Sequence, residues 1–584
     1  MHRRALAAVL VLVACTSDEP NGSSTRDDDA GGFPPRPLCV EGKSVDGEYP
    51  KVAFDLAILG TPPDFAFEGE AGSIRLHDYF EPCADRSRLL VVRIGAPWCG
   101  TCRWDLAHTG EIRALDVGPR LAWLDLLVSN RDNDVPTLAD LTEYRSLIDV
   151  PGALALDPGH QFAAVKARAP LPLYVLLDTR TMTIRNVASD PSPDRLAARI
   201  RYELASLDDA PSPSDPPAPR FDELFDRKQW DLLHAMTPPG APPPDPTNAK
   251  ADDPAAAALG KQLFSDAALS PSGKVACSSC HDPAKHFQDG VPQSTAGLAV
   301  LDRNSPAIAL AAHDRWQFWD GRADTLWMQA LGPFEDEKEI GSSRLFVAHS
   351  VVNRHASAYA SVFGGVPDLA DAARFPPSGK PGDASWQSMT DADRKVVTDL
   401  FVNVGKSIAA FERTLRVKPN RLDAYVAGNL AALTKEEKAG LAAFFHTGCV
   451  QCHWGPRLTD DAFHPDRYPT GRQDGQADRG RIDGIGKLLA SEFAQPHPGL
   501  SAHDRQLGSF KTTGLRGVAH SAPFGHGGTI HRLEDVARIY GTAGIPEADP
   551  RAVGRTEPWL GQFAIQHADE LVPFLRVLTA DIAE

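Results

Sequence analysis

Residues 277–281 read Cys-Ser-Ser-Cys-His, and residues 449–453 read Cys-Val-Gln-Cys-His. Two cysteines three positions apart, followed at once by a histidine, have the spacing that attaches a c-type haem: the thiols reach its two vinyl groups and the histidine binds its iron. A zinc site would need four ligands in one cluster, whereas each motif supplies three. The sequence therefore predicts two covalent c-type haems. Their attachment and iron-binding residues are Cys277, Cys280, His281, Cys449, Cys452 and His453.

The bulk properties predict several folded domains. The chain has 584 residues, which is more than one hydrophobic core usually organises. Hydrophobic residues make up 42% of it, as in ordinary globular proteins, and beyond the N-terminus no apolar run approaches a membrane span. The formal net charge is −17 and no long basic run is present. This charge argues against nucleic acid or an anionic membrane surface as the partner.

The N-terminus has the pattern of a bacterial export signal. A basic start is followed by an apolar stretch over residues 5–13, and residues 12–15 read Leu-Val-Ala-Cys. This end resembles a lipobox, so we expect residues 1–15 to be a lipoprotein signal peptide and Cys15 to carry the lipid. The alternative is a signal cleaved elsewhere. The polar residues 16–38 are expected to form a flexible tether. An exported, periplasm-facing protein anchored to the outer membrane is expected.

A third cysteine pair follows a strand-like run. Residues 89–94 read Leu-Leu-Val-Val-Arg-Ile and lead into residues 98–102, Trp-Cys-Gly-Thr-Cys. A CxxC pair at the end of a strand and the start of a helix has a first thiol with a lowered pKa, because the helix dipole favours the thiolate. A redox pair formed by Cys99 and Cys102 is therefore favoured over a structural disulfide or half of a metal site.

This part of the chain resembles the thioredoxin superfamily, particularly its membrane-tethered periplasmic branch. Residues 171–178, Leu-Pro-Leu-Tyr-Val-Leu-Leu-Asp, resemble the cis-proline strand of that family, which implies that Pro172 faces the cysteine pair. We expect a thioredoxin-like α/β domain over residues 39–208, with an insertion between Cys102 and Pro172. Cys39 and Cys83 remain, either as a disulfide within this domain or as two free thiols.

Proline dominates the next segment. Residues 209–250 are expected to form an extended, semi-rigid linker between domains, because such proline-rich sequence does not pack a core. Within it, residues 221–236 have the pattern of a short docked helix. The sequence leaves open whether the domains on either side of the linker touch.

Several motifs beyond the linker together resemble one enzyme family. They are Leu-Gly-Lys-Gln-Leu-Phe at 259–264, Arg-Asn-Ser-Pro at 303–306, Phe-Trp-Asp-Gly-Arg-Ala at 318–323 and Ala-Pro-Phe-Gly-His-Gly-Gly at 522–528. In combination they resemble the bacterial di-haem cytochrome c peroxidase and MauG family over roughly residues 225–584. The resemblance implies an oxidoreductase with two mainly α-helical cytochrome c-like domains, a peroxidatic domain over 251–400 and an electron-transfer domain over 401–584.

The resemblance also assigns roles around the first haem. Gln329, Pro333 and Glu339 keep the family's spacing, which places a carboxylate on the open face of that haem. A peroxidase needs such a group to move a proton from the inner to the outer peroxide oxygen, so Glu339 is the expected general acid/base. The alternative is a solvated member of the acidic run 335–339. Trp319 stands where the family has an electron-relaying ring between the haems, and a buried core tryptophan is the alternative.

Two positions bear on the iron ligands. Counting from the motif at 522–528 places Tyr540 where MauG-like members have a tyrosine ligand to the second haem iron and ordinary peroxidases have methionine. A phenolate at that place favours high-valent iron. Gly297 stands where reductively activated peroxidases carry a removable histidine, so we expect the first haem to be open. His286 or His313 are the alternative ligands that would close it.

A calcium ion between the haems is also implied by the resemblance. Asn304, Ser521 and Pro523 match the family's site, with serine where threonine is usual, and a hard cation accepts amide and carbonyl oxygens. An ordinary loop is the alternative.

Three functions fit these residues. The first is reduction of hydrogen peroxide at the first haem, with electrons from a small periplasmic donor protein entering through the second haem. The second is MauG-like oxidation of a side chain on a partner protein, which Tyr540 favours. The third is a non-enzymatic electron-transfer protein linking the haems to Cys99 and Cys102, in which Glu339 would have no purpose.

Overall fold

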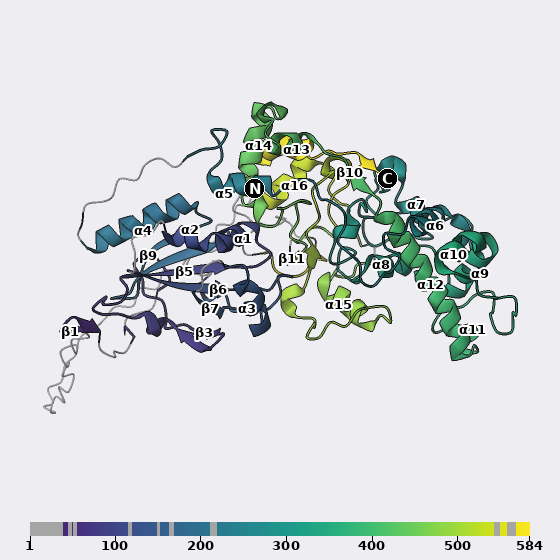
Figure 1. Ribbon diagram of the computed structural model, residues 1–584, viewed down its shortest axis with the longest axis horizontal. Helices are drawn as coiled ribbons and strands as arrows, with labels where there is room; N and C mark the ends of the chain where they lie inside the picture. The colour runs from purple at the N-terminus through teal and green to yellow at the C-terminus, as the bar shows by residue number, and fades with distance from the viewer. Residues whose placement is uncertain are drawn as a thin grey trace, which may run out of the picture.

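The chain folds into a thioredoxin-like α/β domain and two mainly helical domains, as the computed structural model shows (Figure 1). The structure describes residues 39–44, 49–50, 55–114, 120–148, 152–162, 169–208, 210, 219–465, 467–472, 474–541, 549, 551–557 and 568–584. The expected signal peptide, the tether and Cys15 lie outside the described residues. Within the described part, no helix combines the length and the apolar character needed to cross a bilayer.

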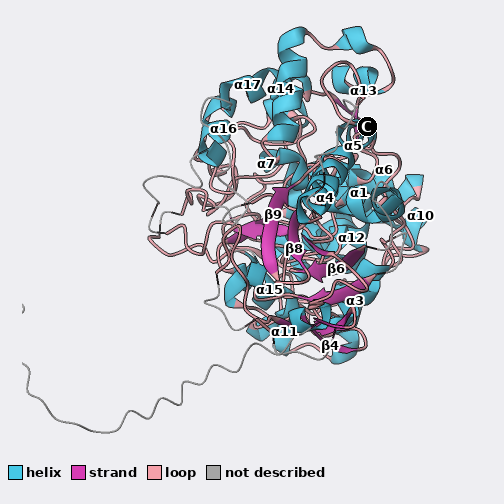
Figure 2. Cartoon of the chain, turned by 90° about the vertical axis from the view of Figure 1, so that its left-hand side faces the viewer, coloured by secondary structure: helices cyan, strands magenta, loops and turns pink. Residues whose placement is uncertain are grey.

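A seven-stranded sheet forms the first domain, in the order β4-β3-β7-β6-β5-β8-β9. Strands β5, β6 and β7 run parallel, and β8 runs antiparallel to β5. Its strands are β3 (Ala66–Gly69), β4 (Gly72–Arg75), β5 (Leu89–Gly95), β6 (Leu121–Leu127), β7 (Ala153–Leu156), β8 (Leu173–Asp178) and β9 (Thr183–Ser189). Its helices are α1 (Gly100–Ala107), α2 (Thr109–Ala114), α3 (Leu138–Arg145) and α4 (Pro193–Leu207). Figure 2 views the molecule from the side of this sheet.

The strand order and the cysteine pair confirm the thioredoxin-like fold. Every residue of β5 is buried, as a central strand covered on both faces must be, and the strand leads to Cys99, the N-cap of α1. The peptide bond between Leu171 and Pro172 is cis and directly precedes β8. Two short strands, β1 (Cys39–Val40) and β2 (Lys43–Ser44), stand before the sheet, and a disulfide joins Cys39 to Cys83.

The proline-rich segment is not a free spacer over residues 219–250. Helix α5 (Arg227–His234) lies within it, as expected, and packs between α1 of the first domain and the helices of the last. Farther along, Thr247 accepts a hydrogen bond from Trp327 at 2.8 Å and Asn248 donates one to the Lys406 carbonyl at 3.0 Å. The expectation of an extended linker is therefore wrong for this stretch, because its apolar and polar side chains are bound by the domains that it joins.

The first haem domain is built on one long helix. Helix α12 (Asp391–Glu412) packs against α6 (Pro254–Ser265) and α8 (Leu326–Glu335), and a glycine on α6 permits the close approach, since a Cβ at Gly260 would lie 1.8 Å from the Ser407 carbonyl oxygen. The remaining helices are α7 (Cys277–Cys280), α9 (Arg344–Arg354), α10 (Ala356–Phe363) and α11 (Ala384–Gln387). The expected boundary at 400/401 is misplaced, because it falls inside α12, whose Phe401 and Phe411 belong to this domain's core.

The second haem domain follows α12. Its helices are α13 (Arg421–Val426), α14 (Lys435–His446), α15 (Arg481–Ala490), α16 (Leu533–Gly541) and α17 (Ala568–Val577). Its short sheets pair β11 (Phe463–Pro465) with β12 (Ser509–Lys511), and β10 (Arg416–Val417) with β13 (Ile582–Ala583). Thr434 and Glu437 cap α14 reciprocally, and Gly448 follows the helix at φ 83°, which starts the second CxxCH motif.

The thioredoxin-like domain packs against the second haem domain. In Figure 1, β11 lies between the sheet and the helices of the first haem domain. Asn133, in the loop after β6, donates to the Phe463 carbonyl at 3.2 Å and to Glu557 at 2.9 Å. Arg505 donates to the Val128 carbonyl at 3.2 Å. Residues between Cys102 and Pro172, where an insertion was expected, thus form part of an interdomain contact.

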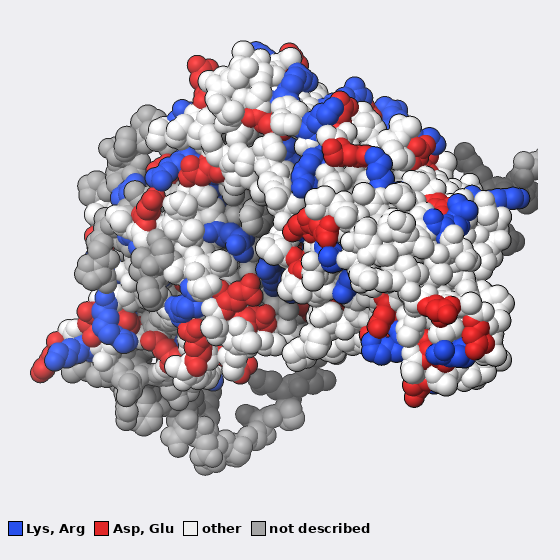
Figure 3. Space-filling view, turned by 45° about the vertical axis from the view of Figure 1, so that its right-hand side comes forward, with Lys and Arg blue, Asp and Glu red and all other residues white. Residues whose placement is uncertain are grey.

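Charges are mixed over the outer surface. On the face shown in Figure 3, lysines and arginines alternate with aspartates and glutamates. The net charge of −17 is therefore not gathered into one acidic patch on that face.

Lys228 on α5 provides a test of how the domains are joined. Its ammonium lies 2.9 Å from Asp105 and 2.6 Å from Asp190, and its side chain is only 4% exposed. Replacing Lys228 by Met leaves the buried carboxylate of Asp105 and the partly buried carboxylate of Asp190 without their cation, so the free energy of unfolding measured in urea should fall by about 3–5 kcal/mol. Lys395→Met is the control: it removes an exposed pair with Asp399 and should cost less than about 1 kcal/mol. Equal losses in the two variants would contradict this role.

Candidate functional site

The first CxxCH motif forms a single helical turn. Cys277 and Cys280 begin and end α7, and the Ala276 amide donates to Ser279 at 3.0 Å, which fixes the entry into the turn. His281 follows with its Nδ1 3.2 Å from the Phe287 carbonyl oxygen. Since Nδ1 donates its hydrogen to that carbonyl oxygen, Nε2 is left as the nitrogen for a metal.

The second motif has the same arrangement. A 3-10 turn, η7 (Cys449–Gln451), follows Gly448. The His453 Nδ1 lies 3.0 Å from the Leu458 carbonyl oxygen, so again Nε2 remains available. Burial lowers the pKa of both His281 and His453, which favours the neutral imidazole that binds iron. None of the four motif cysteines is in a disulfide.

One cavity of about 530 Å³ connects the two motifs. Its walls include most of the residues that the sequence singled out for the haem domains: Cys280, His281, Asn304, Trp319, Gln329, Pro333, Glu339, Cys449, Cys452, His453, Ser521, Pro523 and Tyr540. A smaller cavity of about 40 Å³ beside it is lined by Cys277 and again by His281 and Glu339. The free thiols, the oriented neutral histidines and the space fit two covalently bound haems.

Glu339 is held at the cavity wall by the end of α8. Gln329 and Pro333 lie one turn apart on this helix and both face the cavity. Beyond the helix the chain folds back, and the Ile340 amide donates to the Pro333 carbonyl at 3.1 Å. The proline and glutamate spacing therefore sets where the carboxylate stands.

Burial changes the acidity of this carboxylate. It raises the pKa of Glu339 to about 7, against the opposing effect of the Arg322 guanidinium and with a further rise from Asp336. A group with this pKa both accepts and donates protons near neutral pH. The alternative of a solvated acidic run does not fit Glu339, although its neighbours Asp336 and Glu337 are exposed.

The loop at Gly297 supports the Glu339 backbone. The Leu298 amide donates to the Lys338 carbonyl at 2.8 Å and to the Glu339 carbonyl at 3.1 Å. A Cβ at position 297 would lie 2.6 Å from the Lys338 carbonyl oxygen, so a larger side chain has no room there. His286 lines the cavity with its ring stacked on His520 at 3.8 Å, whereas His313 is not part of the cavity wall.

Trp319 and Asn304 form another part of the wall. The Trp319 indole donates to the Asn304 carbonyl at 2.8 Å, and its ring is 6.5 Å from the ring of His526. The Asn304 side-chain nitrogen donates to the Val291 carbonyl at 2.8 Å, which directs its amide oxygen elsewhere. Ser521 donates to the Val518 carbonyl at 2.9 Å.

Tyr540 lies on α16 on the side of the second motif. Its ring packs edge-on against Tyr468, with 5.7 Å between the ring centroids. Val536 and Ala537, about one turn earlier on the same helix, also line the cavity. One face of α16 therefore lines the cavity that also contains His453, and a ligand role for Tyr540 stays a prediction.

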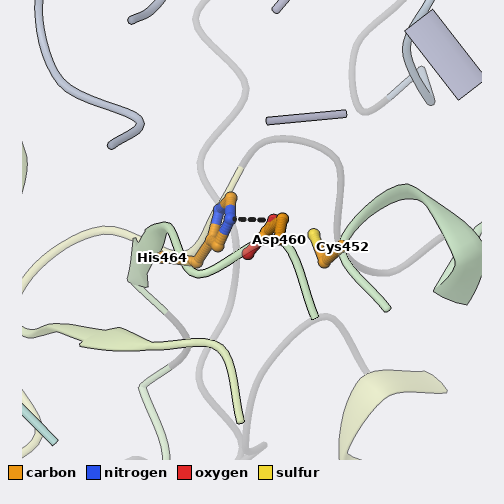
Figure 4. Close-up of side chains that lie close together, drawn as sticks. All are labelled: Cys452, Asp460 and His464. Carbon is orange, nitrogen blue, oxygen red and sulfur yellow. Dashed lines mark hydrogen bonds and ion pairs between the residues drawn. The ribbon is translucent and has the colours of Figure 1, made fainter. Parts of the chain in front are cut away.

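A polar cluster adjoins the second motif. His464 contacts Asp460 at 2.9 Å and Glu557 at 3.2 Å. Figure 4 shows the Cys452 sulfur beside Asp460 and His464. The ligand atoms of Cys452, Asp460 and His464 lie within 4.8 Å of one another. Because Cys452 is needed for haem attachment, this cluster surrounds the haem site and is not a separate metal site.

Sequence reasoning gave no role to several residues at the site. Arg322 lies inside the quoted motif at 318–323, and its positive charge lowers the pKa of Glu339. Glu412, at the end of α12, lines the smaller cavity, and burial raises its pKa to about 8. A lone glutamate in a long helix carries no sequence signal of this kind. Trp454 follows the second motif directly, and its contact with the first domain appears only in the fold.

The Cys99–Cys102 pair lies apart from Glu339, in the thioredoxin-like domain. Cys99 and Cys102 form a disulfide, and the Cys99 sulfur accepts a hydrogen bond from the Cys102 amide at 3.2 Å. Thr101, between them, donates to the Leu171 carbonyl at 3.0 Å. This contact places the residue before Pro172 against the pair, as the thioredoxin resemblance implied.

Known proteins match the haem domains. The family described as di-haem cytochrome c peroxidase matches residues 254–431. A cytochrome c551 peroxidase of Pseudomonas aeruginosa is 32% identical over 291 residues, which cover 49% of this chain and 71% of that protein. A methylamine utilization protein MauG of Methylophilus methylotrophus is 30% identical over 299 residues, covering 50% of this chain and 73% of the relative.

A solved structure matches the first domain. It is described as a putative thiol:disulfide interchange protein DsbE from Chlorobium tepidum. It is 20% identical to this chain, covers 26% of the chain and 99% of its own length, and gives a TM-score of 0.22.

The motif cysteines predict a definite haem content. Replacing Cys449 and Cys452 by Ala should halve the covalently bound haem, measured by intact mass and by the pyridine haemochrome spectrum, because a thioether needs the thiol. Replacing Cys39 and Cys83 by Ala is the control and should leave the haem content unchanged. Full haem content in the first variant would show that these thiols do not attach it.

Proposed function

The chain belongs to the di-haem cytochrome c peroxidase family and is an oxidoreductase, and on that premise we propose that it reduces hydrogen peroxide at the first haem site. The observation that carries this proposal is the placement of Glu339, Gln329 and Pro333 in the wall of the cavity that also contains Cys280 and His281. A haem at this site, when bound, supplies an iron that binds peroxide and takes up its oxidising equivalents.

Glu339 is the proposed proton carrier. Its carboxylate accepts the proton of the inner peroxide oxygen and returns it to the outer oxygen, so that water leaves as the O–O bond breaks. The pKa of about 7 suits both halves of this transfer. Arg322 tunes that pKa, and Gln329 completes the polar wall beside it. The tight contact at Gly297 supports an open first site, because no side chain reaches the cavity from there.

The second site is proposed to receive electrons from a small periplasmic donor protein. His453 and Tyr540 are the residues proposed to hold its iron when a haem is bound, and Trp319 is the proposed relay in the wall that the two sites share. The thioredoxin-like domain adds a thiol–disulfide pair to this unit.

A second candidate function is oxidation of a side chain on a partner protein, as in MauG. The orientation of Tyr540 toward the cavity favours it, since an anionic oxygen ligand stabilises oxidised iron. A purely electron-transferring protein is disfavoured, because it gives no role to the buried carboxylate of Glu339.

Two further features belong to the proposal. A calcium ion held by the Asn304 amide oxygen and by oxygens of Ser521 and Pro523 is supported by their common position on the cavity wall. Export with a lipid at Cys15 is supported by the signal-like N-terminal sequence.

The pH dependence of peroxide reduction tests the role of Glu339. The carboxylate must be deprotonated to accept a proton, so kcat/KM for hydrogen peroxide should fall as the pH drops through about 7. Glu339→Gln should abolish this limb and lower the rate by about 10²–10⁴-fold. Arg322→Ala should move the limb to higher pH, because loss of the cation raises the pKa of Glu339.

The exposed neighbour Glu337 supplies the control, and Glu337→Gln should leave the profile unchanged. A limb near pH 7 that survives in Glu339→Gln would assign the titration to another group.

Electron paramagnetic resonance of the fully oxidised protein tests Tyr540. One high-spin and one low-spin ferric signal are expected, and Tyr540→Phe should alter the low-spin signal, because it removes the ligand oxygen. Tyr468→Phe changes the adjacent ring, 5.7 Å away, and should not. Two low-spin signals that Tyr540→Phe leaves unchanged would indicate that the first haem is closed by a further ligand and that Tyr540 is not a ligand of the second haem.

A further inference from the structure

The thioredoxin-type cysteine pair is covered by the second haem motif. Cys99 is 0% and Cys102 is 2% exposed. Trp454, which directly follows the second CxxCH, lies over Gly100 between the two cysteines: a Cβ there would come within 2.4 Å of the Trp454 ring. The Trp454 indole also donates to the Trp98 carbonyl at 2.8 Å, and the Arg103 guanidinium lies 5.4 Å from its ring centroid. The cover is therefore made of specific contacts.

This cover blocks the usual chemistry of such a pair. Thiol–disulfide exchange requires an external thiolate to approach a sulfur directly. With both sulfurs buried and Trp454 packed over Gly100 between the two cysteines, a thiol of another protein has no approach in this arrangement. The groups that do reach the pair belong to the chain itself.

Those groups are parts of the second haem site. Helix α1, which carries Cys102, packs against η7, which carries Cys449, and Cys452 packs against the hydrophobic cluster that contains Cys99 and Cys102. The Trp98 ring, directly before the pair in the chain, lies edge-on to His464 at 4.7 Å, and His464 adjoins Cys452.

The segment around the cis-proline also connects the cysteine pair to the cavity. Pro170 lines the cavity that connects the two haem motifs, although it belongs to the thioredoxin-like domain. The next residue, Leu171, accepts the hydrogen bond of Thr101 at 3.0 Å. The cis-proline segment thus links the cysteine pair to the cavity that contains the second haem motif.

We propose that the Cys99–Cys102 pair exchanges electrons with the chain's own second haem site through the Trp454 and Trp98 contacts, and not by thiol exchange with another protein. In the oxidising direction two S–H bonds break, one S–S bond forms, and two electrons and two protons are released. Reduction of one hydrogen peroxide to two waters consumes the same two electrons and two protons. The reverse step takes up two electrons and two protons at the disulfide.

The proposal rests on the proposed peroxidase only for peroxide as the final acceptor, so the test uses two oxidants. Holoprotein is incubated anaerobically for a long period with a small dithiol, which reaches the pair during transient local opening of the cover, and is then freed of the reagent. One portion receives hydrogen peroxide and another receives ferricyanide, which takes one electron per ion without peroxide chemistry. Haem absorbance and alkylation of thiols are followed, and peptide mass mapping separates Cys99–Cys102 from Cys39–Cys83.

Two variants disturb the contact from opposite sides. Trp454→Ala removes the ring, and Gly100→Ala displaces it from the thioredoxin side while placing a good helix former in α1. Each should slow oxidation of the pair by about tenfold or more, since small misplacements of reacting groups cost that much, while haem oxidation keeps its native rate. Arg505→Ala loosens the same domain interface away from the cysteines and should behave as the native protein.

The outcomes divide as follows. The exchange is upheld if, in the native protein, the cysteine pair is oxidised at the rate at which the haems respond, and if oxidation of the pair is slower in both contact variants. Native rates in both variants, or a pair that stays reduced after excess ferricyanide has oxidised the haems, overturns it. Rapid reduction of a disulfide peptide by the native protein also overturns it. Pair oxidation by ferricyanide but not by peroxide upholds the exchange and counts against the proposed peroxidase.

Discussion

The structure depends on one constraint: the histidines of both CxxCH turns must face the same cavity. In each turn a hydrogen bond from the histidine Nδ1 to a backbone carbonyl orients the ring. The carbonyls of Phe287 and Leu458 orient the two rings. The helices that frame the turns bury the histidines and so keep them neutral. A haem site made in this way is prepared before any iron is present, because the ligand orientation comes from the protein's own hydrogen bonds.

Burial affects the carboxylates around the cavity differently, depending on whether each is held in an ion pair. Burial alone would raise the pKa of Asp320, but Arg322 and Arg303, at 3.1 and 2.7 Å, hold it well below its ordinary value. Asp320 therefore remains charged and structural. Glu339 has no such ion pair with any residue that the structure describes, and burial dominates, so its pKa reaches about 7. Two acids near one guanidinium acquire different chemistry because only one of them is held in a close ion pair.

Specific contacts hold the thioredoxin-like domain against the rest of the chain. Lys228 ties the helix inside the proline-rich segment to Asp105 and Asp190, and Trp454 ties the second haem motif to the cysteine pair. The thioredoxin-like domain is therefore not an independent module on a spacer. Its cysteine pair is buried where the domain packs against the second haem domain of the same chain.

The sequence by itself determined the two haem attachments, the thioredoxin-like fold and the family, because each depends on residues at fixed short spacings such as Cys-x-x-Cys-His and the strand before Cys99. The position of Glu339 near the first haem could also be predicted from the sequence, because one helix and the turn after it set its spacing from Gln329 and Pro333. The position of the boundary inside α12, the docking of residues 219–250, the pKa of Glu412 and the cover of Trp454 over Gly100 were decided only by the tertiary structure. Each of these depends on which distant segments meet, and burial and contact between segments far apart in the chain leave no local pattern to read.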